Sequence, residues 1–352
     1  MDKEIANSSY EPGRRATLTR RQLLAGLAAT ALCGPLARPD GWGGSRVVVV
    51  RNLRSAAASG VTGVRRALDL GLSRLLRRDD PGSAWAEIVS PPARVSIKVD
   101  AVSPLSSTGD ELIAATLEAL FDRLVQPWEI TVWDRRAADV ARRSFRLRTR
   151  RGAHEVLATE SANSRGVESS GYDSRCRYNP AWLESAAREP SLYTSLLSPQ
   201  PTVLINMPAA KHLPGVGIDG ALTSLALGSV SNTRRFFGSP ETLSRAVAEI
   251  WRRRRGPLRR CALTVMDATN VVFHGGPVGL PAWCAAEDAL VIGSDPVAVD
   301  AVALEKIDAR RREARLPSCL EEGRLLLEAA QQAGIGSASP QVVEVNAPAG
   351  IG

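Results

Sequence analysis

Residues able to do chemistry follow an apolar segment at 203–205, which has the length and composition of a buried strand. The strand is expected to end at Asn206-Met207-Pro208, because proline cannot donate to a sheet ladder. Lys211 and His212 come next. Glycines then recur in a short loop: Gly215, Gly217 and Gly220. A strand that leads into a glycine loop and an apolar helical segment places polar groups at the carboxyl edge of a sheet, where open α/β sheets bind ligands.

Lysine is rare in this chain. Lysine and arginine total 45, and lysine occurs at only four positions: Lys3, Lys98, Lys211 and Lys306. Lysine offers a compact charge whose pKa can shift on burial, whereas arginine offers a planar fork. Because Lys98 and Lys211 stand at predicted strand ends, we expect both to hold or polarise an anion, with His212 as a general acid/base or metal ligand. Chance placement of these lysines stays open as the alternative.

Carboxylates follow several other predicted strands. Asp134, Asp267 and Asp295 would meet the lysines at one sheet edge if the strands are parallel, and such oxygen ligands suit a hard metal ion. The alternative is that these residues are turns and caps. Asp295-Pro296 in particular is a favourable helix start. The candidate cofactor-binding residues lie in the strand end and the glycine loops: Asn206, Gly217, Gly220, Gly275 and Gly276.

Apolar strands alternate along the chain with segments of helical periodicity. This order predicts an α/β fold with a mostly parallel sheet and helices on both faces, built as one domain or as two subdomains. We expect the main domain over residues 45–310, with an internal boundary near 160–180, where a polar loop is predicted. A helix and a strand are expected in 311–352.

The net charge of +8 comes from scattered arginines, and no aromatic residues interleave with them as a nucleic-acid stacking platform would require. We therefore do not expect nucleic-acid binding; a small anionic molecule is the favoured partner. The cysteines beyond the N-terminal region contain no CxxC pair, which argues against an iron–sulfur cluster of ordinary spacing: Cys176, Cys261, Cys284 and Cys319.

The N-terminal residues 1–37 are typical of a twin-arginine export signal, since Arg20-Arg21 directly precedes a short apolar run. The run is too short to span a membrane, and no stable span is expected in the mature chain. These features predict a soluble periplasmic or extracellular protein whose partner during export is the twin-arginine machinery. This route generally carries folded chains, so a metal or another cofactor is compatible with it.

Seven motifs occur in an order and spacing that resemble one family: VSIKVD, STGDEL, TVWD, PTVLINMPAAKH, GIDGAL, HGGP and GSDPVAVDA. The chain resembles the family catalogued as domain of unknown function 362, over roughly residues 48–307. Some members of that family carry ferredoxin-type cluster domains, and this chain lacks the cluster cysteines. The resemblance implies these recurring positions: Lys98, Asp134, Asn206, Lys211, His212, Gly220, Gly276, Pro277, Asp295 and Asp300. It implies no particular reaction.

One departure from the family pattern lies after the Gly-Ala-Leu of the central loop. The family usually continues with lysine and asparagine, whereas this chain has Thr223 and Ser224. The segment is also similar to the glycine–lysine loop of nickel-pincer lactate racemases, whose lysine holds the cofactor. The missing lysine argues against the same cofactor here, so an ammonium group would have to come from Lys98 or Lys211.

Two functional hypotheses follow. The first is an exported α/β protein that binds or transforms a small anionic molecule, with a metal or cofactor at the carboxyl edge. The second is a non-catalytic binding or maturation protein for an exported partner, which the Thr223 departure favours. Under the first hypothesis, Lys211→Ala is expected to abolish ligand-dependent stabilisation and leave the fold intact.

Overall fold

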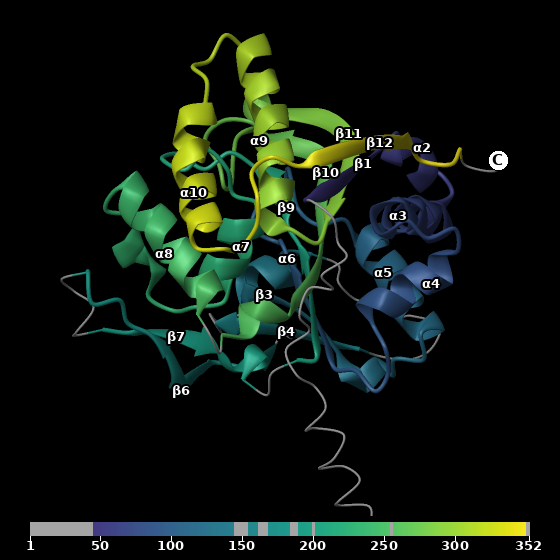
Figure 1. The fold of residues 1–352 in the computed structure, drawn as a ribbon, viewed down its shortest axis with the longest axis horizontal. Coiled ribbons are helices and arrows are strands. Elements are labelled where there is room, and N and C mark those ends of the chain that lie inside the picture. Colours follow the sequence, from purple (N-terminus) through teal and green to yellow (C-terminus); the bar gives the residue numbers. More distant parts are fainter. Residues whose placement is uncertain are drawn as a thin grey trace, which may run out of the picture. The chain divides into compact units, whose positions relative to one another are not determined.

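In the part of the chain that the computed structural model describes, ten strands form one mixed sheet (Figure 1). The structure describes residues 45–143, 154–160, 168–183, 189–198, 201–253 and 256–349, so the predicted export signal lies outside the described residues. The strand order is β12-β1-β11-β10-β8-β2-β3-β4-β5, and β9 pairs with β10. The strands are β1 (Arg46–Arg51), β2 (Val95–Val99), β3 (Ile130–Arg136), β4 (Glu155–Glu160), β5 (Glu168–Ser169), β8 (Val203–Met207), β9 (Ala209–Lys211), β10 (Cys261–Val272), β11 (Cys284–Gly293) and β12 (Gln341–Asn346).

The sheet is parallel at every described pairing except the two made by β11. β11 lies between β1 and β10 and runs antiparallel to both. The predicted mostly parallel α/β fold is therefore confirmed. Parallel neighbours need long crossovers, and helices supply them here.

Helices cover both faces of the sheet, as predicted (Figure 1). β1 shows why: Val47 and Val49 pack into one apolar cluster, and Val48 and Val50 pack into the other. A strand buried on both sides reads as a continuous apolar run. The helices packed on one face are α2 (Leu53–Ala57), α3 (Gly60–Leu76), α4 (Pro81–Ile88) and α5 (Asp110–Asp122). Those on the other are α7 (Ala221–Gly228), α8 (Pro240–Arg252), α9 (Pro296–Glu313) and α10 (Leu320–Gln332).

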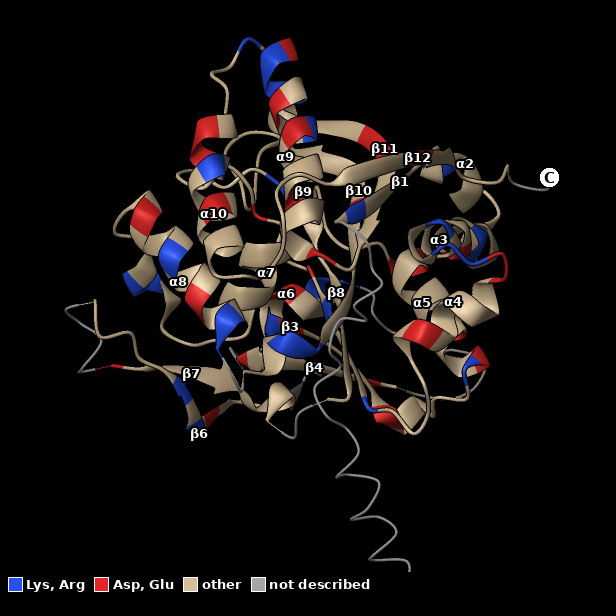
Figure 2. Ribbon diagram, in the orientation of Figure 1, with Lys and Arg blue, Asp and Glu red and all other residues tan. Residues whose placement is uncertain are grey.

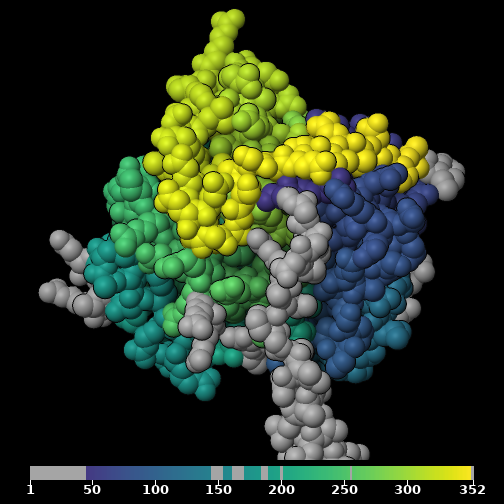
Figure 3. Space-filling model, in the orientation of Figure 1, coloured from purple at the N-terminus to yellow at the C-terminus, as the bar shows by residue number. Residues whose placement is uncertain are grey.

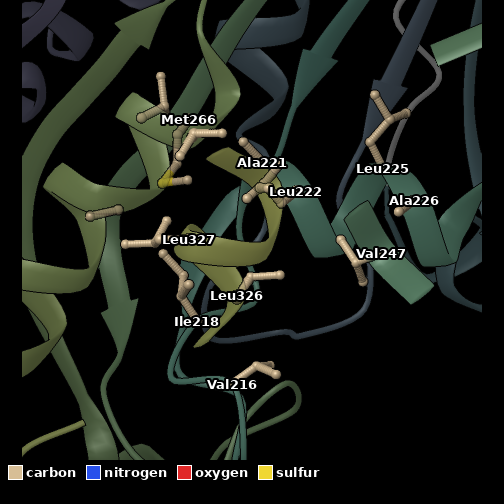
Figure 4. Close-up of a cluster of buried hydrophobic side chains, with 14 of the residues drawn as sticks. Val216, Ile218, Ala221, Leu222, Leu225, Ala226, Val247, Met266, Leu326 and Leu327 are labelled. Carbon is tan, nitrogen blue, oxygen red and sulfur yellow. The ribbon is translucent and has the colours of Figure 1, made fainter. Parts of the chain in front are cut away.

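The second face is held by aliphatic side chains that α7 places between the sheet and the outer helices. Leu222 of α7, Met266 of β10 and Leu326 of α10 belong to one cluster of buried side chains (Figure 4). Complete burial of one such side chain stabilises the fold by about 1.5–3 kcal/mol. This packing fixes α7, whose first residues lie beside the candidate site.

The C-terminal residues add to the sheet that the N-terminal strand begins. β12 pairs in parallel with β1 over six residues, and Figure 3 shows this yellow segment against the purple one. The segment 311–352 thus contributes α10 and an edge strand of the main sheet. None of the described helices is long and apolar enough to cross a membrane.

The polar stretch near 160–180 is not the continuous loop that the composition predicts. It contains β5, which extends the main sheet, and β6 (Tyr172–Tyr178), which pairs antiparallel with β7 (Ser191–Thr194) in a second, two-stranded sheet. Pairing with a distant strand outweighs the weak local propensity of β6. The change from one sheet to the other falls in this stretch, while a domain boundary there stays a prediction. A short helix, α6 (Ala137–Arg142), follows β3.

Candidate functional site

Lys98 is buried at the carboxyl edge of the sheet, with only 2% of its surface exposed. In the strand register it lies beside Asn206 of β8. Its Nζ lies 3.1 Å from Asp134 Oδ1 and donates to Ser224 Oγ at 2.8 Å. Ser224 is one of the two residues, with Thr223, that were predicted to depart from the family pattern. In the structure its hydroxyl is a hydrogen-bond partner of Lys98. The structure therefore brings Lys98 and Asp134 together, as an ion pair.

Lys211 is fully buried next to this pair. Its Nζ donates to Asp100, and it lies 3.7 Å from Asp219 Oδ2. Burial opposes ionisation of Asp100, yet the ammonium groups of Lys211 and Lys98 lower the pKa of that carboxyl. Burial also opposes the charge on Lys211, and the carboxylates of Asp100 and Asp219 outweigh it, so the pKa of Lys211 is raised. The ammonium group of Lys211 is thus held charged inside the protein by carboxylates.

Asp300 connects the central glycine loop to α9. Its two carboxylate oxygens accept the backbone N–H groups of Ala221 and Leu222, at 2.6 and 2.9 Å, where α7 begins. Burial raises the pKa of Asp300 to about 7, against the lowering effect of these two bonds. A Cβ on Gly220 would lie 2.2 Å from Asp300 Oδ1, so glycine is required for the carboxylate to reach the helix. Asn206 Nδ2 donates to Ala221 O at 2.9 Å and holds the same turn.

His212 is 3% exposed, and neither of its ring nitrogens has a hydrogen-bond partner among the described residues. Its Nε2 lies 3.6 Å from Glu322 Oε2, and its ring centroid lies 5.9 Å from that of His274. Burial first, and then the positive charge of Arg311 and the neighbouring His274, lower the pKa of His212 to about 4. The imidazole is therefore neutral at physiological pH. The predicted acid/base role would require a ligand to reach a buried ring.

Two of the predicted cofactor-binding glycines lie so close to neighbouring backbone that no larger residue fits there. A Cβ on Gly276 would lie 1.9 Å from the backbone oxygen of His212, and one on Gly217 would lie 2.7 Å from the backbone nitrogen of Gly323. Gly217 also has φ +71°. Gly275 has φ +66°, and a Cβ there would meet no described atom within 4 Å, so this glycine turns in open space. The glycine loops thus pack the Lys211-His212 segment against the HGGP loop and α10.

The three carboxylates predicted as metal ligands do not form one cluster. Asp134 accepts from the Ala101 N–H at 2.8 Å, in addition to pairing with Lys98. Asp295 caps α9 at the opposite edge of the sheet, because β11 runs antiparallel to its neighbours. Within the described part of the chain, no three His, Cys, Asp or Glu side chains are placed to hold a metal ion.

Asp267 lines a cavity of about 230 Å³ at the carboxyl edge, hereafter the edge cavity. Asp267 accepts the N–H groups of Gly109 and Thr269, each at 2.9 Å, and burial raises its pKa. Arg54 and Arg143 supply positive charge to the lining. The other lining residues come from α2, α3, the segment between β2 and α5, α5 itself and β10: Leu53, Ala57, Val64, Pro104, Leu105, Ser106, Ser107, Gly109, Glu111, Leu112, Thr269 and Asn270.

The hydroxyl of Thr108 connects the segment beside the edge cavity to the main chain near the buried lysines. Thr108 Oγ1 accepts from the Asp100 N–H at 2.8 Å and donates to Met207 O at 2.5 Å. Asp100 is the hydrogen-bonded partner of Lys211. The segment that forms one wall of the cavity is therefore anchored on the main chain of Asp100, the residue whose carboxylate pairs with Lys211.

Several residues that build this region were not among the predicted site residues. Asp219 lies in the GIDGAL motif and pairs with Lys211, so its position in that motif was an available signal. No sequence signal pointed to Arg54, because it is one of many scattered arginines. Its contribution depends on the exposed start of α2 meeting β10, where Arg54 Nη2 donates to Asn270 Oδ1 at 2.6 Å.

A known family matches the part of the chain that contains these site residues. The family model described as "Domain of unknown function (DUF362)" matches residues 95–305, from the first residue of β2 to the middle of α9. The match spans more than half of the chain, and it includes Lys98, Lys211 and Asp300. The protein belongs to the DUF362 family. A search of curated proteins gives no significant match.

Two solved structures show distant similarity. One is the lactate racemase apoprotein from Thermoanaerobacterium thermosaccharolyticum, with 10% identity, a TM-score of 0.37 and coverage of 63% of this chain and 51% of that one. The other is a Thermotoga maritima protein solved by a structural genomics consortium, with 12% identity, a TM-score of 0.38 and coverage of 72% and 59%. The chain therefore spans between about half and three-fifths of the length of these structures.

Proposed function

We propose that the protein binds a small anionic molecule in the edge cavity. The observation that carries the proposal is the composition of this cavity: Arg54 and Arg143 line it together with Asp267 and Asn270, at the carboxyl edge of the parallel strands. Ligands of open α/β sheets bind at that edge. Guanidinium groups form charge-assisted hydrogen bonds to carboxylate or phosphate oxygens.

In this proposal Lys98 and Lys211 are positioning residues. Lys211 pairs with the carboxylate of Asp100, and the main chain of the same residue is hydrogen-bonded to Thr108, next to the residues that form a cavity wall. Their burial and ion pairing support this role over direct contact with the ligand. A catalytic role for His212 and a cofactor site at the glycine loops stay predictions.

The test is a thermal unfolding titration with succinate and with inorganic pyrophosphate, each at constant ionic strength. At about a hundredfold excess over Kd, a ligand stabilises the folded state by about 2.7 kcal/mol, which raises the Tm of a protein of this size by about 4 °C. We expect one of the two probes to raise the Tm of the wild-type protein by about that amount, and Arg54→Gln to lose most of the shift.

The matched control is Arg324→Gln. Arg324 is also an exposed helical arginine, but it pairs with Glu321 and Glu328 on α10. The control should keep the full shift. If neither anion raises the Tm, or if Arg54→Gln and Arg324→Gln respond alike, the edge cavity is not the anion site.

We also propose that the protein is exported by the twin-arginine route. The support is Arg20-Arg21 immediately before the short apolar run at 23–33. Replacing both arginines by lysine keeps the charge and removes the paired guanidinium groups. The variant should stay in the cytoplasm while the wild-type protein is found in the periplasmic fraction; equal export of both would contradict the proposal.

A further inference from the structure

A second cavity, of about 380 Å³, lies on the outer side of α3. It shares no lining residue with the edge cavity. Its lining combines one face of α3 with the start of α4 and with Pro348 beyond β12: Arg66, Asp69, Leu70, Ser73, Arg74, Arg78, Asp79, Pro81 and Pro348. Figure 2 shows the positions of the arginines on α3 in blue. We call this space the α3 cavity.

Two polar groups of the α3 cavity lack partners. Ser73 is 8% exposed, and its hydroxyl has no hydrogen-bond partner among the described residues. The Nε of Arg66 is also shielded from solvent and unpartnered there. A buried donor without a partner destabilises the fold, so a ligand that accepts from these groups would recover the lost free energy. The orphan donors point to an acceptor that binds between them.

The carboxylates of the lining do not neutralise these donors. Asp69 accepts from Arg65 at 2.8 Å and from the Trp85 indole at 2.7 Å, so its oxygens are engaged on the side of α4. Asp79 is exposed to water. Arg78 pairs with Glu87, which leaves Arg66 and Arg74 as the cations that charge the cavity. The cavity is thus lined by donors on one helix face and carries excess positive charge.

We infer that the α3 cavity binds the phosphate group of a small phosphorylated molecule. Guanidinium forks and a serine hydroxyl donate to several oxygens of one tetrahedral anion, and arginine is the side chain suited to that geometry. The volume exceeds that of phosphate alone, which leaves room for the organic part of the molecule. This inference is independent of the edge cavity and of its proposed ligand.

The test is isothermal titration calorimetry of the full-length protein with inorganic phosphate and with ribose 5-phosphate, at constant ionic strength. Saturable binding of ribose 5-phosphate is expected. Arg66→Gln should weaken it about tenfold or more, because a charge-assisted bond is lost. Ser73→Ala should weaken it about two- to tenfold, and since alanine is the best helix former the variant is expected to fold. A far-ultraviolet circular dichroism spectrum checks that.

The matched control is Arg324→Gln, which should leave the affinity for ribose 5-phosphate unchanged. Arg54→Gln tells the two cavities apart: if binding is lost in Arg54→Gln but kept in Arg66→Gln, the phosphate lies in the edge cavity and the inference is wrong. Tighter binding of ribose 5-phosphate than of phosphate supports an organic phosphate as the ligand, and equal affinities would reduce the inference to an inorganic phosphate site. Absence of saturable binding, or equal affinities in the wild-type, Arg66→Gln and Ser73→Ala proteins, would overturn it.

Discussion

Acidification should destabilise this fold through His212. In the unfolded chain the imidazole takes up a proton near its ordinary pKa of about 6.5. In the folded protein its pKa is lowered to about 4, by burial and by the positive charge of Arg311. The unfolded state therefore binds the proton first. The contribution of His212 to stability is complete above pH 6.5 and is lost progressively as the pH falls toward 4.

The size of the effect follows from the two pKa values. Full protonation of the unfolded state, with the folded state still neutral, corresponds to about 3 kcal/mol, and at about pH 4.5 the loss is about 2.5 kcal/mol. Glu322 would favour the charged ring at 3.6 Å. Its side chain is 40% exposed, so solvent screens the pair and the offset is small.

Urea unfolding of the wild-type protein and of His212→Gln, at several values between about pH 7.5 and 4.5, measures this contribution. Asp300, whose pKa is raised, stabilises the fold on acidification, and His154, whose pKa is lowered by burial, destabilises it. Both groups are present in both proteins, so the difference between the two pH profiles isolates His212. Parallel profiles would refute the reasoning, since they would mean that the folded protein accommodates the imidazolium at no cost.

Two further outcomes are expected from urea unfolding near neutral pH. Lys211→Met should destabilise the protein by about 3–5 kcal/mol, because it leaves Asp100 buried without its hydrogen-bonded cation; a loss below about 1 kcal/mol would show that Asp100 becomes protonated or hydrated instead. Gly276→Ala should cost about 1–3 kcal/mol or more, since its Cβ would lie 1.9 Å from the His212 backbone oxygen. Gly238→Ala is the control, with open space at the Cβ position, and an equal cost in both variants would contradict the steric argument.

The first of these outcomes would differ from the sequence-based prediction that Lys211→Ala leaves the fold intact. The sequence predicts that Lys211, at the end of a strand, holds or polarises an anion. In the structure it is fully buried between Asp100 and Asp219. The partners lie far apart in the chain, and their meeting depends on which strands are neighbours, which local patterns do not specify. A buried lysine with two carboxylate partners stabilises the fold and is also a candidate site residue.

The α/β class could be predicted because it depends on local periodicity and on the order of strands and helices. The direction of β11 could not, because an apolar run reads the same whether its strand is parallel or antiparallel. That one reversal separates Asp295 from Lys98 and places it in a helix cap at the opposite edge. The edge cavity was equally hidden, since its arginines come from surface positions with no distinctive neighbours.

The position of β1 has a consequence for how the chain reaches its folded state. Val47 pairs with Gly293 on one side and with Val342 on the other, so the earliest described strand to leave the ribosome has sheet partners only in the last part of the chain. Pairings between residues so distant in sequence form slowly, because the connecting loop must close first. While synthesis continues, the central strands can assemble, but β1 must wait with its four consecutive valines exposed. The sheet is therefore completed only after β11 and β12 have been synthesised, and a chaperone that shields β1 of the nascent chain until then should raise the yield of folded protein.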